Sequence, residues 1–179
     1  MSGPPSIEGS QSFMLSPWVT LMTRTVVFDK SEPAEVYHSF RQNDYVTVLA
    51  ETRAGEIVLV RQYRPALEAY TLELPGGLRD GEIEPAICAV RELEEEAGYR
   101  CLSPLSLLGN LCPDSGRLEN RFWCYFTNDI EPVPAWRPER GIDRVMLPKS
   151  EYLDTIRTGK FSMALHIAVT ALALLNNKF

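Results

Sequence analysis

The chain has 179 residues and a mass of 20.2 kDa, a length that suits one domain with a short extension. Its hydrophobic fraction of 45% is too high for a disordered chain. There are 24 acidic residues against 18 basic ones, so the formal net charge is −6. This balance argues against binding nucleic acid through bulk electrostatics, because such proteins neutralise phosphates with Lys and Arg.

The order of predicted elements runs from a polar N-terminus through many strands to two closing helices. Residues 1–17 are rich in Gly, Pro and Ser and are expected to form a disordered tail. The runs 45–50 and 57–63 flank a turn and are predicted to pair as a hairpin. Residues 129–141 contain three prolines and a glycine and are predicted to be an irregular loop. The predicted strands are 18–28, 35–40, 45–50, 57–63, 71–74, 105–109, 121–126 and 142–147, and the predicted helices are 85–98, 149–158 and 163–176.

Strands in the first two thirds and helices late in the chain predict an α+β fold with a mixed sheet. The cysteines form no Cys-x-x-Cys pair, so neither a structural zinc site nor a disulfide framework is expected. Two histidines lack partners at ligand spacing and are interpreted as structural or solvated. These residues are Cys88, Cys101, Cys112 and Cys124, with His38 and His166.

The N-terminus has no basic region followed by an apolar stretch, so it does not look like a signal peptide. The longest apolar run, 163–175, is interrupted by His166 and Thr170 and is too short to span a bilayer. We therefore expect a soluble cytoplasmic protein without a membrane partner.

The helix predicted after Pro85 carries an acidic face. On a helical wheel of about 100° per residue, Glu92, Glu95 and Glu96 share one arc, and Glu94 points elsewhere. Like charges at these spacings cost about 0.2–0.5 kcal/mol per pair. Clustered hard oxygens suit Mg²⁺ or Mn²⁺, whereas the alternative is a solvated acidic face.

The strand and glycine-rich loop before this helix strengthen the prediction of a metal site. Pro75-Gly76-Gly77 ends a strand, and the helix that follows resembles the Nudix hydrolase family, whose box is G-x5-E-x7-R-E-U-x-E-E-x-G-U with U apolar. The run 91–99, Arg-Glu-Leu-Glu-Glu-Glu-Ala-Gly-Tyr, matches the second half of the box. The first glutamate of the box does not fit, because Ile83 stands six residues after Gly77. Its role stays open between the two flanking residues, Glu82 and Glu84.

The resemblance implies a Nudix-type α/β/α sandwich that hydrolyses a diphosphate linkage with Mg²⁺, Mn²⁺ being possible. It implies that Glu92 and Glu96 hold the metal with help from Glu95 and the Gly76 carbonyl. It also assigns Arg91, Glu95 and Glu96 to the catalytic set. A bound metal would lower the pKa of the attacking water, so a Ser or Cys nucleophile is not needed.

Two further stretches are similar to the ADP-ribose pyrophosphatase branch of this family. They are 60–64, Val-Arg-Gln-Tyr-Arg, and 72–77, Leu-Glu-Leu-Pro-Gly-Gly. The branch implies cleavage of ADP-ribose to AMP and ribose 5-phosphate. The alternatives are cleavage of GDP-mannose, UDP-glucose or a dinucleotide, or nucleotide sensing without turnover.

The branch also implies residues outside the box, each with a structural alternative. Glu139 would be a base or an extra metal ligand, or else a plain surface residue. Arg64 would contact phosphate, or else form an ion pair. Trp18 and Tyr37 would stack on the nucleobase, or else belong to the core. Ser115 and Gly116 lie in the loop that would bind substrate.

Homodimerisation through exchanged N-terminal strands is implied by the same resemblance. The expected organisation is a disordered tail over 1–17, a strand extension over 18–44 and a Nudix hydrolase domain over 45–179. The expected ligand is a small nucleoside diphosphate.

Overall fold

The computed structural model describes residues 4–179, which divide into two compact units. The larger unit comprises Asp44–Leu111 and Phe122–Phe179. The smaller unit comprises the described residues up to Asn43 together with Cys112–Arg121, a segment that the sequence had assigned to the larger region. In the described part of the chain, no helix is long and apolar enough to cross a membrane.

The smaller unit is a three-stranded antiparallel sheet of β1 (Ser6–Ser16), β2 (Val19–Val27) and β3 (Glu35–Arg41). The prediction of a disordered tail is therefore wrong over Ser6–Ser16, while residues 1–3 lie outside the described residues. The reason is long-range pairing. Glycine and serine weaken the strand signal of this segment, yet its backbone pairs along nearly its whole length with the β-branched residues of β2.

The segment Cys112–Arg121 is attached to this sheet through Glu119. Glu119 Oε1 accepts hydrogen bonds from Arg24 Nη1 at 2.5 Å and from Ser39 Oγ at 2.6 Å. The Glu119 backbone N–H also donates to the Phe40 carbonyl at 3.0 Å. The hydrogen bond from Arg24 is the main cause that lowers the pKa of Glu119 to about 2.

The larger unit contains a mixed sheet, because β4 and β10 pair in parallel while their outer neighbours run antiparallel. A second sheet is antiparallel, and a two-stranded ribbon adds to these. The sheet orders are β7 (Gly76–Leu78)-β4 (Tyr45–Ala50)-β10 (Phe122–Thr127)-β9 (Ser106–Leu111), β12 (Ile142–Pro148)-β5 (Glu56–Arg64)-β6 (Ala69–Glu73), and β11 (Ile130–Pro132)-β8 (Tyr99–Cys101). The helices are α1 (Pro85–Ala97), α2 (Lys149–Arg157) and α3 (Ala164–Leu175).

Two local predictions need correction. β4 and β5 do not form a hairpin, since they lie in different sheets and share the single bridge Glu51↔Ile57. β4 is buried over most of its length and β5 over part of its first half, Ile57–Val60, and each takes a central position between two other partners. The loop 129–141 is not irregular throughout, because Ile130–Pro132 pairs with Tyr99–Cys101, and its proline stands at the strand end where no ladder donor is needed.

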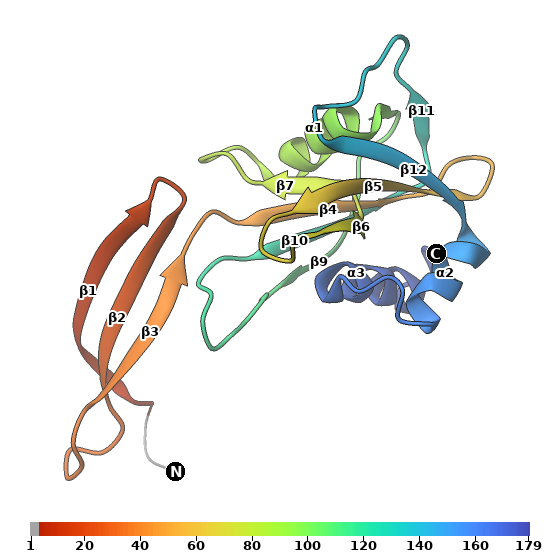
Figure 1. Cartoon of the computed structure of the whole chain (residues 1–179). Helices are drawn as coiled ribbons and strands as arrows, with labels where there is room; N and C mark the ends of the chain where they lie inside the picture. The colour runs from red at the N-terminus through yellow and green to blue at the C-terminus, as the bar shows by residue number, and fades with distance from the viewer. Residues whose placement is uncertain (1–3) are drawn as a thin grey trace. The chain divides into compact units, whose positions relative to one another are not determined.

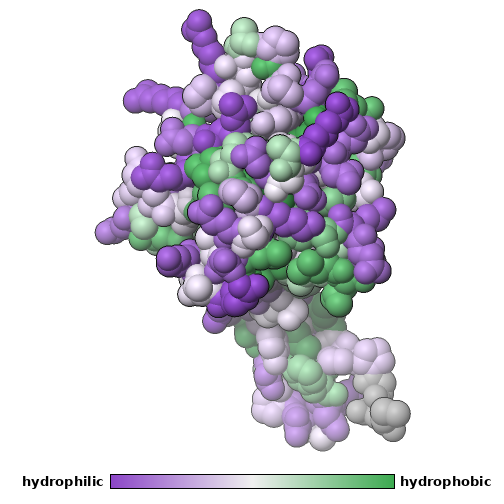
Figure 2. Space-filling view, turned by 90° about the vertical axis from the view of Figure 1, so that its right-hand side faces the viewer, coloured by the Kyte–Doolittle hydropathy of each residue, from purple (hydrophilic) through white to green (hydrophobic). Residues whose placement is uncertain are grey.

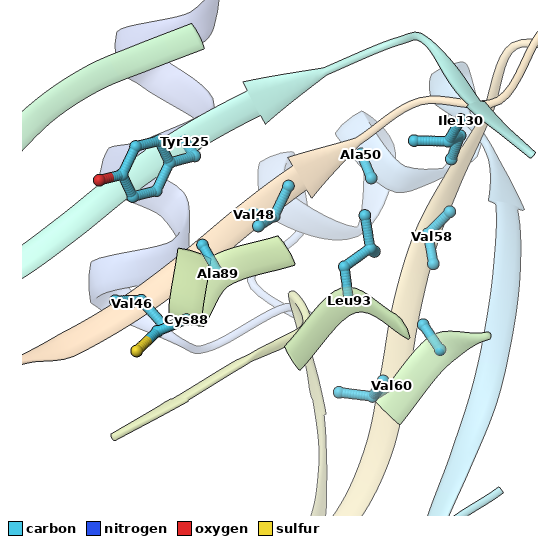
Figure 3. Packing of buried hydrophobic residues seen from close by; sticks show 11 residues of the cluster. Val46, Val48, Ala50, Val58, Val60, Cys88, Ala89, Leu93, Tyr125 and Ile130 are labelled. Carbon is cyan, nitrogen blue, oxygen red and sulfur yellow. The ribbon is translucent and has the colours of Figure 1, made fainter. Parts of the chain in front are cut away.

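The larger unit is an α/β/α sandwich, which confirms the predicted fold class. In Figure 1, α1 covers one face of the sheets, and α2 and α3 cover the other. Alternating side chains of the central strands feed the two faces. On β4, Val46 and Val48 join the core under α1, whereas Leu49 joins the core on the opposite side. Figure 3 shows Ala89 of α1 beside Val46 and Val48, and Leu93 near Ala50 and Val58.

Helix α1 begins and ends where its sequence signals predicted. Pro85 occupies the first turn, and Gly98 ends the helix in the left-handed conformation with φ of 67°. One side of the helix buries Cys88, Ala89 and Leu93 in the core. All four cysteines of the chain are free, as expected.

Candidate active site

The backbone between β6 and β7 is fixed from two sides before it reaches α1. The Pro75 carbonyl accepts hydrogen bonds from the Thr47 hydroxyl at 2.9 Å and from the Val48 N–H at 3.0 Å. The Leu74 N–H donates to His166 Nδ1 of α3 at 3.0 Å. Strand β4 and helix α3 therefore hold this turn, and α1 contacts the strand β7 that follows it.

The acidic side of α1 lies against the two glycines of β7. The Gly76 N–H donates to Glu96 Oε2 at 2.9 Å. A Cβ atom added at Gly77 would lie 2.7 Å from Glu92 Oε2, so no side chain fits there without moving that carboxylate. A Cβ added at Gly76 would lie 2.3 Å from the Val46 carbonyl oxygen. Glycine at position 77 lets the Glu92 carboxylate approach the backbone closely, and glycine at position 76 lets β4 do so.

Two of these carboxylates are poorly solvated. Glu96 is 6% exposed, and burial raises its pKa to about 7 despite the hydrogen bond from Gly76. The negative charges of Glu92 and Glu139 push the pKa of Glu96 in the same direction. Burial also raises the pKa of Glu92, against the opposing hydrogen bond from Arg91. Buried carboxylate oxygens that lack full charge compensation suit a divalent cation of the Mg²⁺ or Mn²⁺ type.

Arg91 arranges the remaining acids around this face. Its Nη2 lies 2.6 Å from Asp80 Oδ2 and 3.0 Å from Glu92 Oε1, and its Nε lies 3.5 Å from Glu95 Oε2. Glu95 thus turns towards Arg91, and its side chain is 49% exposed. Within residues 4–179, no three acidic, histidine or cysteine side chains converge closely enough to form a ready metal cluster. The structure brings Glu92 and Glu96 to the Gly76–Gly77 backbone, and it pairs Glu95 with Arg91.

Arg64 forms an ion pair with a residue to which the sequence assigned no role. Its Nε and Nη2 each donate to the Glu73 carboxylate at 2.7 Å, and the Thr71 hydroxyl donates to the same carboxylate at 2.5 Å. Burial would raise the pKa of Glu73, which is 2% exposed, but these donors outweigh it and lower the pKa. The Arg64 side chain remains 42% exposed, and the charge of Glu96 contributes to raising its pKa. The local sequence carries no signal that marks Glu73 as the partner of Arg64.

The other predicted substrate residues all belong to the smaller unit. Trp18 lies in the β1–β2 turn and is 66% exposed, and Tyr37 on β3 is 46% exposed, so neither is a core residue. The Tyr37 hydroxyl donates to Glu35 Oε2 at 2.9 Å. Ser115 and Gly116 lie in a turn of Cys112–Arg121 and are exposed. The Tyr37 ring packs against Phe28, with centroids 6.1 Å apart, and both Trp18 and Tyr37 keep exposed surface.

Comparison with known proteins identifies the family. The NUDIX domain profile matches residues 41–164, which is more than half of the chain. The methanol dehydrogenase activator of Bacillus methanolicus is 46% identical over 56 residues, 31% of this chain and 30% of that protein. The ADP-ribose pyrophosphatase of Bacillus subtilis (strain 168) is 48% identical over 54 residues, 30% of this chain and 29% of that protein. The matches therefore span less than a third of these two relatives.

Longer matches support the same assignment. The CMP-5'-(N-acetyl-N-hydroxy-3-aminopropyl)phosphonate hydrolase of Streptomyces rubellomurinus (strain ATCC 31215) is 28% identical over 147 residues, 81% of this chain and 70% of that protein. A crystal structure of an ADP compounds hydrolase superposes with a TM-score of 0.81 at 20% identity, covering 99% of this chain and 98% of that one. That structure shares the fold. With the box on α1 and the profile match over 41–164, the chain belongs to the NUDIX domain family.

Proposed function

We propose that the protein is a metal-dependent hydrolase that cleaves the diphosphate bond of ADP-ribose, giving AMP and ribose 5-phosphate, or of a related nucleoside diphosphate sugar. The observation that carries the proposal is the face of α1 where Glu92 and the buried Glu96 meet the Gly76–Gly77 backbone. The proposal is supported by relatives named ADP-ribose pyrophosphatase and ADP-sugar pyrophosphatase.

The proposed metal is Mg²⁺, with Mn²⁺ as a substitute. Glu92, Glu96 and the Gly76 carbonyl would hold it, with Glu95 as a further ligand. When bound, the ion would neutralise diphosphate oxygens and make a water molecule more acidic. It would compete with Arg91 for Glu92, whose Oε1 now accepts a hydrogen bond from that guanidinium at 3.0 Å.

The residues of the chain would bind and orient the substrate. Arg64 offers the exposed part of a guanidinium that Glu73 holds in a fixed plane, a geometry suited to phosphate. Trp18 and Tyr37 would stack on the base, and the turn with Ser115 and Gly116 would contact the substrate as well. Glu139 would accept the proton from the attacking water as the general base.

A second candidate substrate comes from the relative that matches 81% of the chain. Its name describes a hydrolase of a CMP-linked phosphonate. An anhydride between CMP and a phosphonate presents the same bridging oxygen between two phosphorus atoms as ADP-ribose does. A CMP-linked compound therefore belongs in the substrate panel.

The test is a hydrolysis assay with ADP-ribose, GDP-mannose, UDP-glucose, NADH and a CMP-linked phosphonate, each with Mg²⁺ and with Mn²⁺. Glu96→Gln should lose activity about 100-fold or more, because several kcal/mol of charge stabilisation corresponds to that factor. Glu94→Gln, an exposed glutamate of the same helix, is the matched control. Tight nucleotide binding without any product from the unaltered chain would instead identify a sensing module.

We also propose that two copies associate through the smaller unit. In that unit, only Met22 and Asn120 among the described residues are buried. Figure 2 shows hydrophobic residues at the molecular surface, and Phe13, Leu15 and Phe28 of the smaller unit are at least half exposed. A small sheet needs an apolar face covered to be stable, and a second copy offers the same surface. Sedimentation equilibrium that shows a single 20.2 kDa chain at micromolar concentration would remove this proposal.

We also propose that the protein is located in the cytoplasm. The support is that all four cysteines are free, which is the usual state of thiols in a reducing compartment.

A further inference from the structure

The loop between β11 and β12 is fastened to the last turn of α1. The Trp136 indole Nε1–H donates to the Glu95 carbonyl at 3.0 Å, and the Val133 N–H donates to the Gly98 carbonyl at 2.9 Å. The final carbonyls of an α-helix have no partner within the helix. Here the loop supplies donors to them, so the end of the helix and the start of the loop form one hydrogen-bonded assembly.

The Trp136 ring also packs against this helix end. A Cβ added at Gly98 would lie 2.4 Å from ring atom Cδ2, so the indole occupies the space that any side chain there would need. The guanidinium of Arg144, on β12, lies 4.7 Å from the ring centroid. Its Nη1 donates to the Ala97 carbonyl at 3.0 Å. Trp136 is thus held by a hydrogen bond, by van der Waals contact and by a cation–π contact.

Glu139 lies three residues beyond this anchor, in a short span that ends at β12. The Ile142 N–H donates to the Glu139 carbonyl at 3.1 Å, which fixes the other end of the span. Glu96 lies in that same last turn of α1, one residue after Glu95, whose carbonyl accepts the Trp136 N–H. The loop that carries Glu139 is therefore attached to the same helix that carries Glu92 and Glu96.

We infer that Trp136 is a positioning residue, which fastens the loop to the end of α1 and so holds Glu139 close to the last helical turn, where Glu96 lies. The inference rests on the proposed function, because Glu139 acts as the base only if the protein hydrolyses its ligand. Trp136 itself touches helix and loop atoms in this arrangement and acts through Glu139.

The test is a double-mutant cycle between Trp136 and Glu139, assayed on the best substrate of the panel with Mg²⁺. Glu139→Gln should lower kcat about 100-fold, the usual contribution of a general base. Trp136→Phe keeps an aromatic ring and removes the indole N–H, and should lower kcat about 10-fold with KM unchanged, since a small misplacement of a catalytic group is costly. The double variant should lose about 100-fold, as Glu139→Gln alone does, rather than the 1000-fold of independent effects.

Two controls separate positioning from general damage. Trp123→Phe removes another indole N–H donor, the one that binds Asp44 Oδ2 at 3.0 Å, and should show no coupling to Glu139→Gln. Mn²⁺ affinity and melting temperature of Trp136→Phe should stay close to those of the unaltered chain. If that variant does not fold, Arg144→Met, which removes the cation over the ring, should show the same coupling with a smaller loss.

The outcomes are distinguishable. Additive losses in the cycle, or full activity of Trp136→Phe, would overturn the positioning role alone. Absence of turnover by the unaltered chain on every substrate would overturn the proposed function and this inference with it. Turnover with a coupled cycle supports both.

Discussion

Protonation of His166 is expected to limit the stability of the protein in acid. The imidazole lies on α3 inside the core, where its Nδ1 accepts the Leu74 N–H at 3.0 Å and its ring stacks on Phe122 with centroids 6.0 Å apart. Burial lowers the pKa of His166 to about 4, with Glu73 opposing and Arg64 adding to the shift. The informative change is His166→Gln, which keeps an acceptor for the Leu74 N–H and does not titrate.

The sign and size of this change in stability follow from the difference in the pKa of His166 between the folded and unfolded chains. The pKa of His166 falls from 6.5 when unfolded to about 4 when folded, so the unfolded chain alone takes up a proton between these values. Stability is therefore complete above pH 6.5 and is lost as pH falls towards 4. At about 1.4 kcal/mol per pKa unit, the free energy of unfolding drops by about 3 kcal/mol across this window.

The assay is urea unfolding at intervals from pH 7.5 to pH 4, with the unaltered chain and His166→Gln compared at each pH. The unaltered chain should lose about 3 kcal/mol more than the variant over this range. Subtracting the variant removes the shared effect of other titrating groups such as Glu119. His38→Gln, an exposed histidine of β3, is the matched control. Parallel curves for the unaltered chain and His166→Gln would refute the assignment of His166 as a buried neutral acceptor.

Two further substitutions test the frame around the site. Glu73→Gln removes a buried carboxylate that accepts two hydrogen bonds from a guanidinium, and should lower the free energy of unfolding by about 2 kcal/mol. Asp143→Asn, in an exposed ion pair, should lower it by under about 0.5 kcal/mol. Urea unfolding of each variant measures both values. At Gly98, with φ of 67°, an alanine would be strained and would also clash with the Trp136 ring, whereas at Gly55, with φ of 76°, it would be strained but in open space. Gly98→Ala should therefore lower the melting temperature clearly more than Gly55→Ala. Equal shifts would mean that the indole contact contributes nothing.

The parts of the fold that local signals specify were predictable from the sequence. Pro85 and Gly98 bound α1, and the apolar and acidic faces between them follow the helical period. The short apolar runs of β4 and β10 were placed to within a residue or two. Each of these elements carries its own pattern, so one sequence suffices to find it.

The parts that depend on distant partners were not predictable. β1 is a strand because it pairs with β2, and β11 is a strand because it pairs with β8. The hairpin prediction for β4 and β5 failed for the same reason, since each strand pairs elsewhere.

In the candidate site, too, the features with a local sequence pattern were predictable and the long-range contacts were not. The box locates Glu92, Glu95 and Glu96 on α1, but nothing in the local sequence shows that Glu73 binds Arg64 or that an indole caps the end of the helix. Arg64 and Glu73 lie on the neighbouring strands β5 and β6, so their contact depends on the strand register, whereas the indole contact joins residues 41 positions apart.

We propose that the Glu92–Glu96 face of α1 hydrolyses a nucleoside diphosphate with a divalent metal. The most direct measurement is the rate of AMP release from ADP-ribose with Mg²⁺ by the unaltered chain, Glu96→Gln and Glu94→Gln under identical conditions. We expect turnover by the unaltered chain and by Glu94→Gln, with a loss of about 100-fold or more in Glu96→Gln. Equal rates for Glu96→Gln and the unaltered chain would contradict the proposed role of this face in hydrolysis.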